Sequence, residues 1–328
     1  MIRAFAVSVA LSALALGSCG GGGDSKPPVT GTSSPTPTPS PTSAITYTKF
    51  ADISTNQAFK AGCGGIFGIS EVFDAFGFGR ADTVTLGVSI DYQASSQSYR
   101  FRGRAYDGTP YDYTFDPTLI QTTNAPANTT YYRKANADGS VERFYLGRRP
   151  LGSFQPEYVR TALLNYRNGS GPPEVRDCVF GVPTTLEDTR PSQTVSYNNA
   201  AVAGYVFVDT GSGLRQYTTG DSTVTISANP NSGEIPVTLK LAGREVSAAG
   251  ESSTVTQLGE YRGTASVDGS VQSFNAAFTD GDRAILGGNF AGWFFGPQGI
   301  EIGFGWSIKS QFQDGSVLTG SGTVTARR

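Results

Sequence analysis

Apolar and polar residues alternate with a period of two along most of the chain, which is the pattern of β-strands buried on one face. In the first half this pattern predicts the strands Thr83–Tyr92, Tyr99–Tyr106, Tyr111–Phe115, Thr130–Lys134, Val141–Gly147 and Tyr158–Tyr166. Asp-Gly pairs, which favour hairpin turns, begin at Asp107, Asp138, Asp268, Asp280 and Asp314. Long runs of helix formers are missing, so we predict an all-β protein.

The second half predicts a further set of about eight strands. They are Ala201–Val208, Thr223–Ala228, Glu234–Ala242, Tyr261–Val267, Val271–Thr279, Ala284–Phe295, Ile300–Gln311 and Ser316–Ala326. Glycines recur among large aromatic residues in the stretch from 285 to 308, which suits the sharp coiling of a small closed barrel. Eight antiparallel strands give a barrel whose interior side chains can fill. We therefore predict an eight-stranded antiparallel β-barrel with these aromatic residues in its core.

Three arginines, Arg100, Arg102 and Arg104, alternate along one predicted strand and share a face. Matching this strand to the next one predicts a turn at residues 107–109, with Arg104 opposite Asp112 and Arg100 opposite Asp116. We interpret the row as a solvated, ion-paired face. A site for an anion or a lipid headgroup is the alternative.

The N-terminus has the pattern of an export signal. Met1-Ile2-Arg3 is a short positive segment, and an apolar run follows that is too short to span a bilayer. Leu16-Gly17-Ser18-Cys19 fits a lipobox, in which the cysteine thiol receives a lipid. We predict a lipoprotein signal peptide over 1–18 with Cys19 lipidated, palmitate included. An ordinary secretory signal with an incidental cysteine is the alternative.

Composition then divides the chain. Residues 19–43 are rich in Gly, Ser, Thr and Pro and cannot bury a core, so we predict a tether. The remainder is long enough for two domains. We place an N-terminal β-rich domain at 44–185 and the C-terminal barrel at 186–328.

Charge and residue usage exclude several classes of function. The 25 Lys and Arg nearly balance the 27 Asp and Glu, which disfavours a nucleic-acid binder. The chain has 0 His, so catalytic triads that use histidine and the commonest zinc and haem ligands are excluded. We find no motif for an enzyme, a metal site or a cofactor. Glu301 is interpreted as a charge that accepts backbone N–H groups or pairs with an arginine.

Two cysteines remain once Cys19 is assigned to lipid. An even pair in an exported chain predicts a disulfide, here Cys63–Cys178. Two separate buried thiols are the alternative. Neither cysteine has a catalytic context, because no histidine or second nearby cysteine accompanies it.

The C-terminal sequence also carries a family pattern. Gly288-x-Phe290, then Phe295-Gly296-Pro297-x-x-x-Glu301-Ile302-Gly303, resembles the barrel signature of transferrin-binding protein B-like surface lipoproteins of Gram-negative bacteria. The family usually has Tyr, Ala and a second Gly where this chain has Phe294, Gly299 and Phe304. The stretch from Phe180 to Gly204 resembles the junction before the barrel in alphaproteobacterial members.

This resemblance implies a handle-like N-terminal domain and a function. It implies a lipid-anchored protein of the outer membrane, displayed at the cell surface, that binds an iron carrier such as transferrin or a haem-protein. Cargo would pass to a partner transporter in the outer membrane. A non-catalytic structural or adhesin-like accessory lipoprotein is the alternative.

Ligand recognition is expected on loops and on the first domain, because a barrel filled by its own side chains has little room. The candidates are Tyr131, Tyr132 and Arg133, since Tyr and Arg are enriched in binding hot spots. The competing interpretation is that these tyrosines pack the first domain. Adjacent strand residues point to opposite faces, so at most one of the two tyrosines is expected to be buried.

Overall fold

The computed structural model describes residues 45–67, 80–83, 88–105, 108–123, 125–167, 173–189, 191–268 and 272–328. The predicted signal peptide, the tether and Cys19 lie outside the described residues. Residues Ile45–Arg328 form one compact unit. The predicted boundary at 185/186 falls between the two sheets of this unit, and the division into two domains stays a prediction.

The described residues form two antiparallel sheets and no α-helix, so the predicted all-β class is confirmed. The first sheet contains β1 (Gln57–Phe67), β2 (Arg80–Thr83), β3 (Ser89–Gln93), β4 (Ser98–Arg104), β5 (Pro110–Phe115), β6 (Ile120–Gln121), β7 (Thr129–Ala135), β8 (Val141–Gly147), β9 (Val159–Arg167) and β10 (Pro173–Gly181). The second contains β11 (Val195–Ser196), β12 (Asn199–Asp209), β13 (Leu214–Thr218), β14 (Thr223–Ala228), β15 (Glu234–Ser247), β16 (Gly250–Val267), β17 (Ser273–Ala277), β18 (Asp280–Gly281), β19 (Ala284–Phe295), β20 (Glu301–Gln311) and β21 (Val317–Arg327). Short 3₁₀ segments are η1 (Phe50–Asp52), η3 (Pro117–Leu119) and η4 (Pro297–Gly299).

The second sheet closes into the predicted eight-stranded barrel. Its ring runs through β12, β13, β15, β16, β17, β19, β20 and β21 and returns to β12. The last strand closes it, because β21 pairs with β12 along its whole length, from Asn199 opposite Arg327 to Asp209 opposite Val317. Phe290, Phe304 and Trp306 are fully buried in the barrel core, as predicted, but Trp293 and Phe295 are buried outside it, against Val159 and Val179 of the half-barrel.

The barrel differs from the sequence prediction on one side. Strand β13 was not predicted. Both β13 and β14 pair with β15, and β13 is the one that takes this position in the ring. Strands β15 and β16 are 14 and 18 residues long and extend well beyond the predicted runs. Their exposed ends carry many polar residues and little apolar alternation, which removes the signal on which the prediction rested.

The first sheet is a half-barrel. Its strand order is β5-β4-β3-β1-β10-β9-β8-β7-β6. Phe101 on β4 and Phe144 on β8 lie with ring centroids 4.8 Å apart, although four strands separate β4 from β8 in that order. The sheet must therefore curl so that its two outer groups of strands share one concave core. That core is rich in stacked and edge-on aromatic rings.

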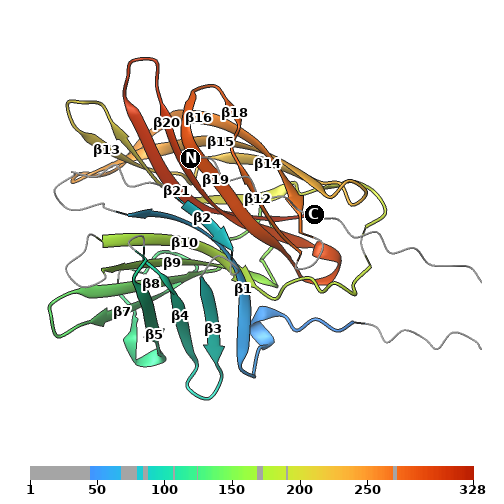
Figure 1. The fold of residues 1–328 in the computed structure, drawn as a ribbon. Coiled ribbons are helices and arrows are strands. Elements are labelled where there is room, and N and C mark those ends of the chain that lie inside the picture. Colours follow the sequence, from blue (N-terminus) through green and yellow to red (C-terminus); the bar gives the residue numbers. More distant parts are fainter. Residues whose placement is uncertain are drawn as a thin grey trace, which may run out of the picture. The chain divides into compact units, whose positions relative to one another are not determined.

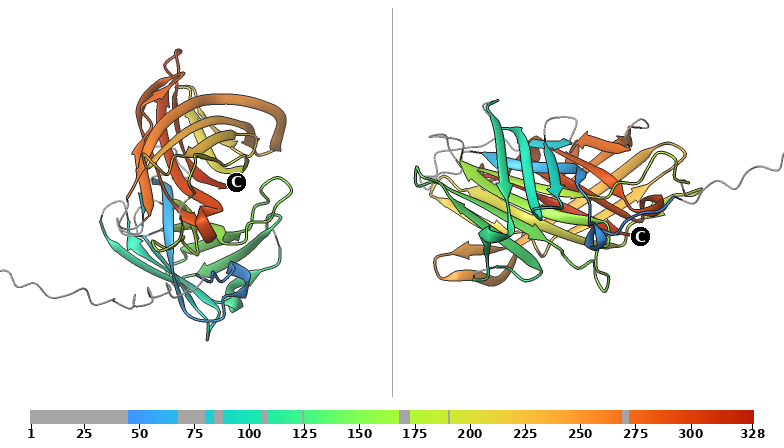
Figure 2. Two further views of the ribbon diagram at one scale, coloured as in Figure 1. Left: turned by 90° about the vertical axis from the view of Figure 1, so that its right-hand side faces the viewer. Right: turned by 90° about the horizontal axis from the view of Figure 1, so that it is seen from below.

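Strands β1 and β10 lie in the middle of the half-barrel and carry the predicted disulfide. Cys63 and Cys178 face each other in the antiparallel pair and are bonded, with their Cα atoms 4.0 Å apart. The chain therefore enters and leaves the half-barrel on neighbouring strands. Figure 1 shows β1 and β10 beside the barrel strands, and Figure 2 shows the half-barrel in blue to green with the closed ring in yellow to red.

The convex face of the half-barrel packs on the barrel through backbone. A Cβ at Gly64 would lie 2.0 Å from the carbonyl oxygen of Trp306, and one at Gly62 would lie 2.2 Å from that of Ala291. Only glycine allows this approach. The Trp293 indole donates to the carbonyl oxygen of Ala61 at 2.9 Å across the same contact.

Glu301 joins the two sheets a second time. Its carboxylate is fully buried and accepts the backbone N–H groups of Glu157, Tyr158 and Val159 at 2.7, 2.9 and 3.0 Å. The Arg327 guanidinium lies 3.7 Å away. Both parts of the interpretation of Glu301 are confirmed.

Candidate functional site

A cleft of about 1360 Å³ lies between the convex face of the half-barrel and the barrel wall. Strands β7 to β10 form one side of it, and β12, β13 and β21 form the other. Side chains on this face of the half-barrel are those that strand alternation turns away from the concave core. The alternating pattern that builds the core therefore also supplies the lining of the cleft.

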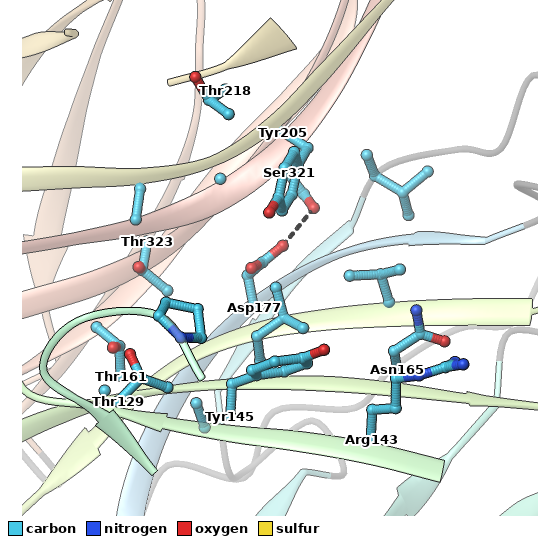
Figure 3. A pocket seen from close by; sticks show the side chains of 18 of the residues that line it. Thr129, Arg143, Tyr145, Thr161, Asn165, Asp177, Tyr205, Thr218, Ser321 and Thr323 are labelled. Carbon is cyan, nitrogen blue, oxygen red and sulfur yellow. Dashed lines mark hydrogen bonds between the residues drawn. The ribbon is translucent and has the colours of Figure 1, made fainter. Parts of the chain in front are cut away.

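The half-barrel wall is ordered in rows, because residues directly opposite in register share a face. The middle row runs Tyr131, Tyr145, Leu163 and Asp177. The row on one side runs Thr129, Gly147, Thr161 and Val179, and the row on the other runs Arg133, Arg143, Asn165 and Val175. Figure 3 shows the threonines at one end of the cleft and Arg143 with Asn165 at the other.

Asp177 lies deepest in this wall, where the half-barrel meets the barrel. It is 5% exposed and accepts a hydrogen bond from the Ser321 hydroxyl at 2.8 Å. Burial raises the pKa of Asp177 to about 6, against the lowering effects of the Ser321 hydrogen bond and the Arg149 charge. The cleft therefore contains a carboxyl that changes charge close to neutral pH.

Tyrosines face the cleft from both walls. Tyr145 on β8 stacks on Tyr131, with ring centroids 4.5 Å apart, and Tyr205 on β12 is 38% exposed on the barrel wall. Burial raises the pKa of Tyr145 to about 12, so its hydroxyl stays protonated at neutral pH. These side chains offer flat apolar surface and hydrogen-bonding hydroxyls to a ligand, but not phenolate oxygens.

Carboxylates on the barrel wall are already engaged. Glu251 accepts the Thr218 hydroxyl at 2.5 Å, and Asp221 pairs with Arg244 at 2.9 Å. The Asp221 pair is partly exposed and contributes little to stability, but it holds this charge away from a ligand.

The predicted ligand-binding residues divide between the two faces of the half-barrel. Tyr132 lies in the concave core, stacked on Phe144 at 5.0 Å. Tyr131 and Arg133 share the face that lines the cleft, where Tyr131 adjoins Tyr145 and Arg133 is exposed opposite Arg143. The role of all three in ligand binding stays a prediction.

One expectation about these tyrosines is wrong. They point to opposite faces as expected, but both are buried, at 8% and 4% exposed for Tyr131 and Tyr132. The reason is that each face is covered: the core buries Tyr132, and the stack with Tyr145 shields Tyr131.

The register predicted for the arginine hairpin is also wrong by two residues. Arg102, not Arg104, lies opposite Asp112, and Arg104 lies opposite Pro110. The Ala105 N–H donates to the Thr109 carbonyl at 2.7 Å, so the connection closes earlier than predicted. A shift of two residues leaves each side chain on its original face, so Tyr111 and Phe115 still face the core.

The arginine row is paired in spite of the shifted register. Arg100 makes a two-point contact with Asp112, with Nε donating at 2.7 Å, and Arg102 pairs with Asp91 at 2.6 Å. Arg104 donates to the Gly108 carbonyl at 2.9 Å. The contacts of Arg100 and Arg102 agree with the interpretation of an ion-paired face.

Sequence reasoning missed the residues at the floor of the cleft, above all Asp177, Asn165 and Tyr205. One signal was available, because Asp177 directly precedes Cys178, which was predicted to form a disulfide. A carboxylate beside a buried position in a strand indicates a polar environment on the opposite face.

Comparisons with known proteins give a likeness in structure alone. No protein-family model matches the chain, and no curated protein matches it. A transferrin binding protein B (TbpB) double mutant from Haemophilus parasuis Hp5 is similar at 12% identity and a TM-score of 0.33, over 78% of this chain and 55% of that one. Isotype 1 TbpB from serogroup B Neisseria meningitidis is similar at 9% identity and a TM-score of 0.32, over 84% and 77%. The chain spans about half the length of the Haemophilus protein.

No group of three or more Asp, Glu or Cys side chains among the described residues is arranged to hold a metal ion. No helix in the same residues is long and apolar enough to cross a membrane.

Proposed function

We propose that this protein is a non-enzymatic binding protein, and that the cleft between the half-barrel and the barrel is its ligand site. The cleft combines tyrosines on both walls with arginine, asparagine and threonine, which are side chains typical of binding surfaces. Its volume of about 1360 Å³ exceeds the ~300–1000 Å³ of common small-molecule pockets. A segment of a protein ligand therefore suits it better than a small metabolite.

The proposal extends to location and partners through the family resemblance of the sequence. The protein is lipidated at Cys19, anchored to the outer membrane and displayed at the cell surface. Its ligand is an iron carrier or a haem-protein, and an outer-membrane transporter receives the cargo. The cleft supports this role because a rigid two-walled site can hold a protein segment without any bound cofactor.

Capture of named ligands tests the cleft. The full chain, immobilised, is exposed to transferrin and to haemoglobin and then to the supernatant of an iron-starved culture. The double variant Tyr145→Ala, Tyr205→Ala should reduce capture at least tenfold while circular dichroism shows that the protein remains folded. The control Leu286→Ala removes an exposed apolar side chain outside the cleft and should have no effect. Equal capture by all three proteins contradicts the assignment of the site.

Anchoring is tested independently of binding. Intact-mass measurement of the mature protein should show acyl chains at Cys19, and Cys19→Ser should release the protein from the membrane or leave it unprocessed. A mature N-terminus at another residue, without lipid, contradicts the proposed anchor.

A further inference from the structure

Arg143 and Arg167 line the outer end of the half-barrel wall of the cleft, and Arg133 adjoins them on the same face of the sheet. Arg133 on β7 lies directly opposite Arg143 on β8, and Arg143 lies opposite Asn165 on β9. Arg167 follows two residues along β9 on the same face. We call Arg133, Arg143 and Arg167 the cleft arginines.

Among the residues that the structure describes, the cleft arginines have no carboxylate partner. None of their guanidinium groups lies within 4.0 Å of an Asp or Glu oxygen of the residues that the structure describes. The Arg167 charge contributes to the lowered pKa of Asp138, although hydrogen bonds from Ser140 are the main cause of that lowering. Like charges directly opposite on neighbouring strands are destabilising. The repulsion between Arg133 and Arg143 therefore destabilises the protein, and no acidic side chain of the described residues pairs with either arginine to offset it.

Other basic side chains of the half-barrel do have acidic partners. Arg100 and Arg102, at the other end of the half-barrel, each hold an aspartate. Lys134, directly beside Arg133 in sequence, points to the opposite face and pairs with Glu142 at 3.2 Å. The missing partners are thus a property of the cleft end and not of the whole sheet.

The spacing of the cleft arginines fits an extended anionic chain. Arg133 and Arg143 are directly opposite on neighbouring strands, roughly 5 Å apart, and Arg143 and Arg167 are diagonal neighbours, roughly 7–8 Å apart. Alternate side chains of an extended peptide repeat at roughly 6.6 Å, which lies between these two distances. A guanidinium binds a carboxylate through two parallel hydrogen bonds, so each arginine can take one acidic side chain. The adjoining tyrosine row, Tyr131 and Tyr145, offers apolar surface to the residues between them.

We propose that the cleft arginines bind an extended acidic segment of a protein ligand, with Asn165 beside them as a further hydrogen-bonding group. This inference rests on the proposed function, because it names the chemistry of the ligand that the cleft receives. In this proposal the acidic side chains of the ligand lie at the outer end of the cleft, away from Asp177. Neutral or apolar residues of the ligand continue toward the tyrosines.

Fluorescein-labelled hexaglutamate is the probe, and its anisotropy with the full chain is the readout. The wild-type protein should bind it, and binding should weaken as salt is raised. The variant Arg133→Gln, Arg143→Gln, Arg167→Gln should bind at least tenfold more weakly. The matched control Arg100→Gln, Arg102→Gln, Arg104→Gln removes the same charge from the same face and should stay within threefold of wild type. Circular dichroism melts check that both variants remain folded.

Four outcomes overturn the proposal. Wild-type protein fails to bind the peptide, or both triple variants weaken equally, which indicates general charge attraction. Inorganic phosphate displaces the peptide where sodium chloride of equal ionic strength does not, which indicates a site for small anions. Phosphatidylglycerol vesicles, but not the peptide, depend on the cleft arginines, which indicates a membrane surface.

The proposed function can fail separately. If the cleft-arginine variant loses hexaglutamate but captures the natural ligand normally, the cleft still binds and the acidic segment is refuted. If the tyrosine variant captures its ligand normally, the proposed site is wrong whatever the peptide does.

Discussion

The barrel and the half-barrel close their cores in different ways. The barrel sheet returns to its first strand, so β21 and β12 satisfy each other's backbone and no edge remains in the ring. The half-barrel keeps two edges, at β5 and β6 among the described strands. It is held instead by a disulfide between its central strands, by aromatic packing across its concave side and by contact with the barrel. The closed ring satisfies its own strand edges by backbone hydrogen bonds. The half-barrel instead depends on separate contacts, each of which can be removed by mutation.

The largest effect should come from breaking the ring. Deleting Gly320–Arg328 removes most of β21 and leaves β12 and β20 as open edges. We expect a cost comparable to the whole stability of a domain, about 5–15 kcal/mol, and loss of the cooperative melt. Hydrogen exchange should show β12 and β20 unprotected. Removal of Arg328 alone is the control, and an unchanged melting temperature after the full deletion contradicts ring closure.

Removing the disulfide should affect the half-barrel and spare the barrel. Cys63 and Cys178 are 115 residues apart, and closing so long a loop stabilises by about 4–5 kcal/mol in the chain-entropy model. Cys63→Ala, Cys178→Ala should lower the free energy of unfolding by about that amount in urea melts. Hydrogen exchange should place the loss in β3 to β9. Reductant should destabilise the wild type and leave the variant unchanged. Equal loss of protection in the barrel strands contradicts the separation.

Glu301 tests how far the half-barrel depends on the barrel. Glu301→Ala leaves three backbone N–H groups at the start of β9 without their acceptor. A buried donor without a partner costs about 1–3 kcal/mol, so we expect a loss of about 3 kcal/mol or more. Glu251→Ala removes an exposed carboxylate and is the control, with a loss below ~1 kcal/mol. A variant as stable as the wild type means that water replaces the carboxylate.

The smallest effect is a pH dependence from Asp177. Its native pKa is raised to about 6, so the folded state binds this proton more tightly than the unfolded state. The cost of the buried charge is present above pH ~6 and disappears as pH falls toward ~4. Asp177→Asn should therefore stabilise the protein by about 1–3 kcal/mol at pH 7.5, at roughly 1.4 kcal/mol per pKa unit, and by little at pH 4.5.

Melts of wild type and variant at both pH values measure this difference. Asp138→Asn, an exposed carboxylate held by Ser140, is the control and should not produce the same pattern. A gain that is the same at both pH values contradicts titration of Asp177.

The sequence predicted the barrel more fully than the half-barrel, for a physical reason. Barrel strands such as β19 and β20 bury large aromatic residues, and the Asp-Gly pair at Asp314 marks the turn into β21. The missed strands β1 and β10 are the central strands of the half-barrel. Glycine in β1 indicates a break in most strands, but Gly62 and Gly64 are present because the barrel backbone approaches them closely.

Strand β10 was hidden by its charges. Glu174, Arg176 and Asp177 are all buried, although charged residues are typical of exposed positions. Glu174 accepts the Tyr166 hydroxyl at 2.7 Å and lies 3.3 Å from Arg176, and Asp177 faces the cleft. A period-two pattern records the polarity of a side chain but not the partner that makes its burial acceptable. The cleft is formed by two distant parts of the chain, and no local pattern predicts which residues of each will meet there.

The disulfide also determines how tension would travel through the molecule. Pulling on the chain at Ile45 loads β1, and the covalent bond at Cys63 passes that load directly to Cys178 on β10. From there it continues to the linker and the barrel, where the Tyr47 hydroxyl already donates to Asp188 at 2.8 Å. Residues 64–177, including the whole cleft wall on β7 to β9, lie inside the bridged loop and outside this load path. Tension applied between the two ends of the described chain would therefore leave that wall unstretched.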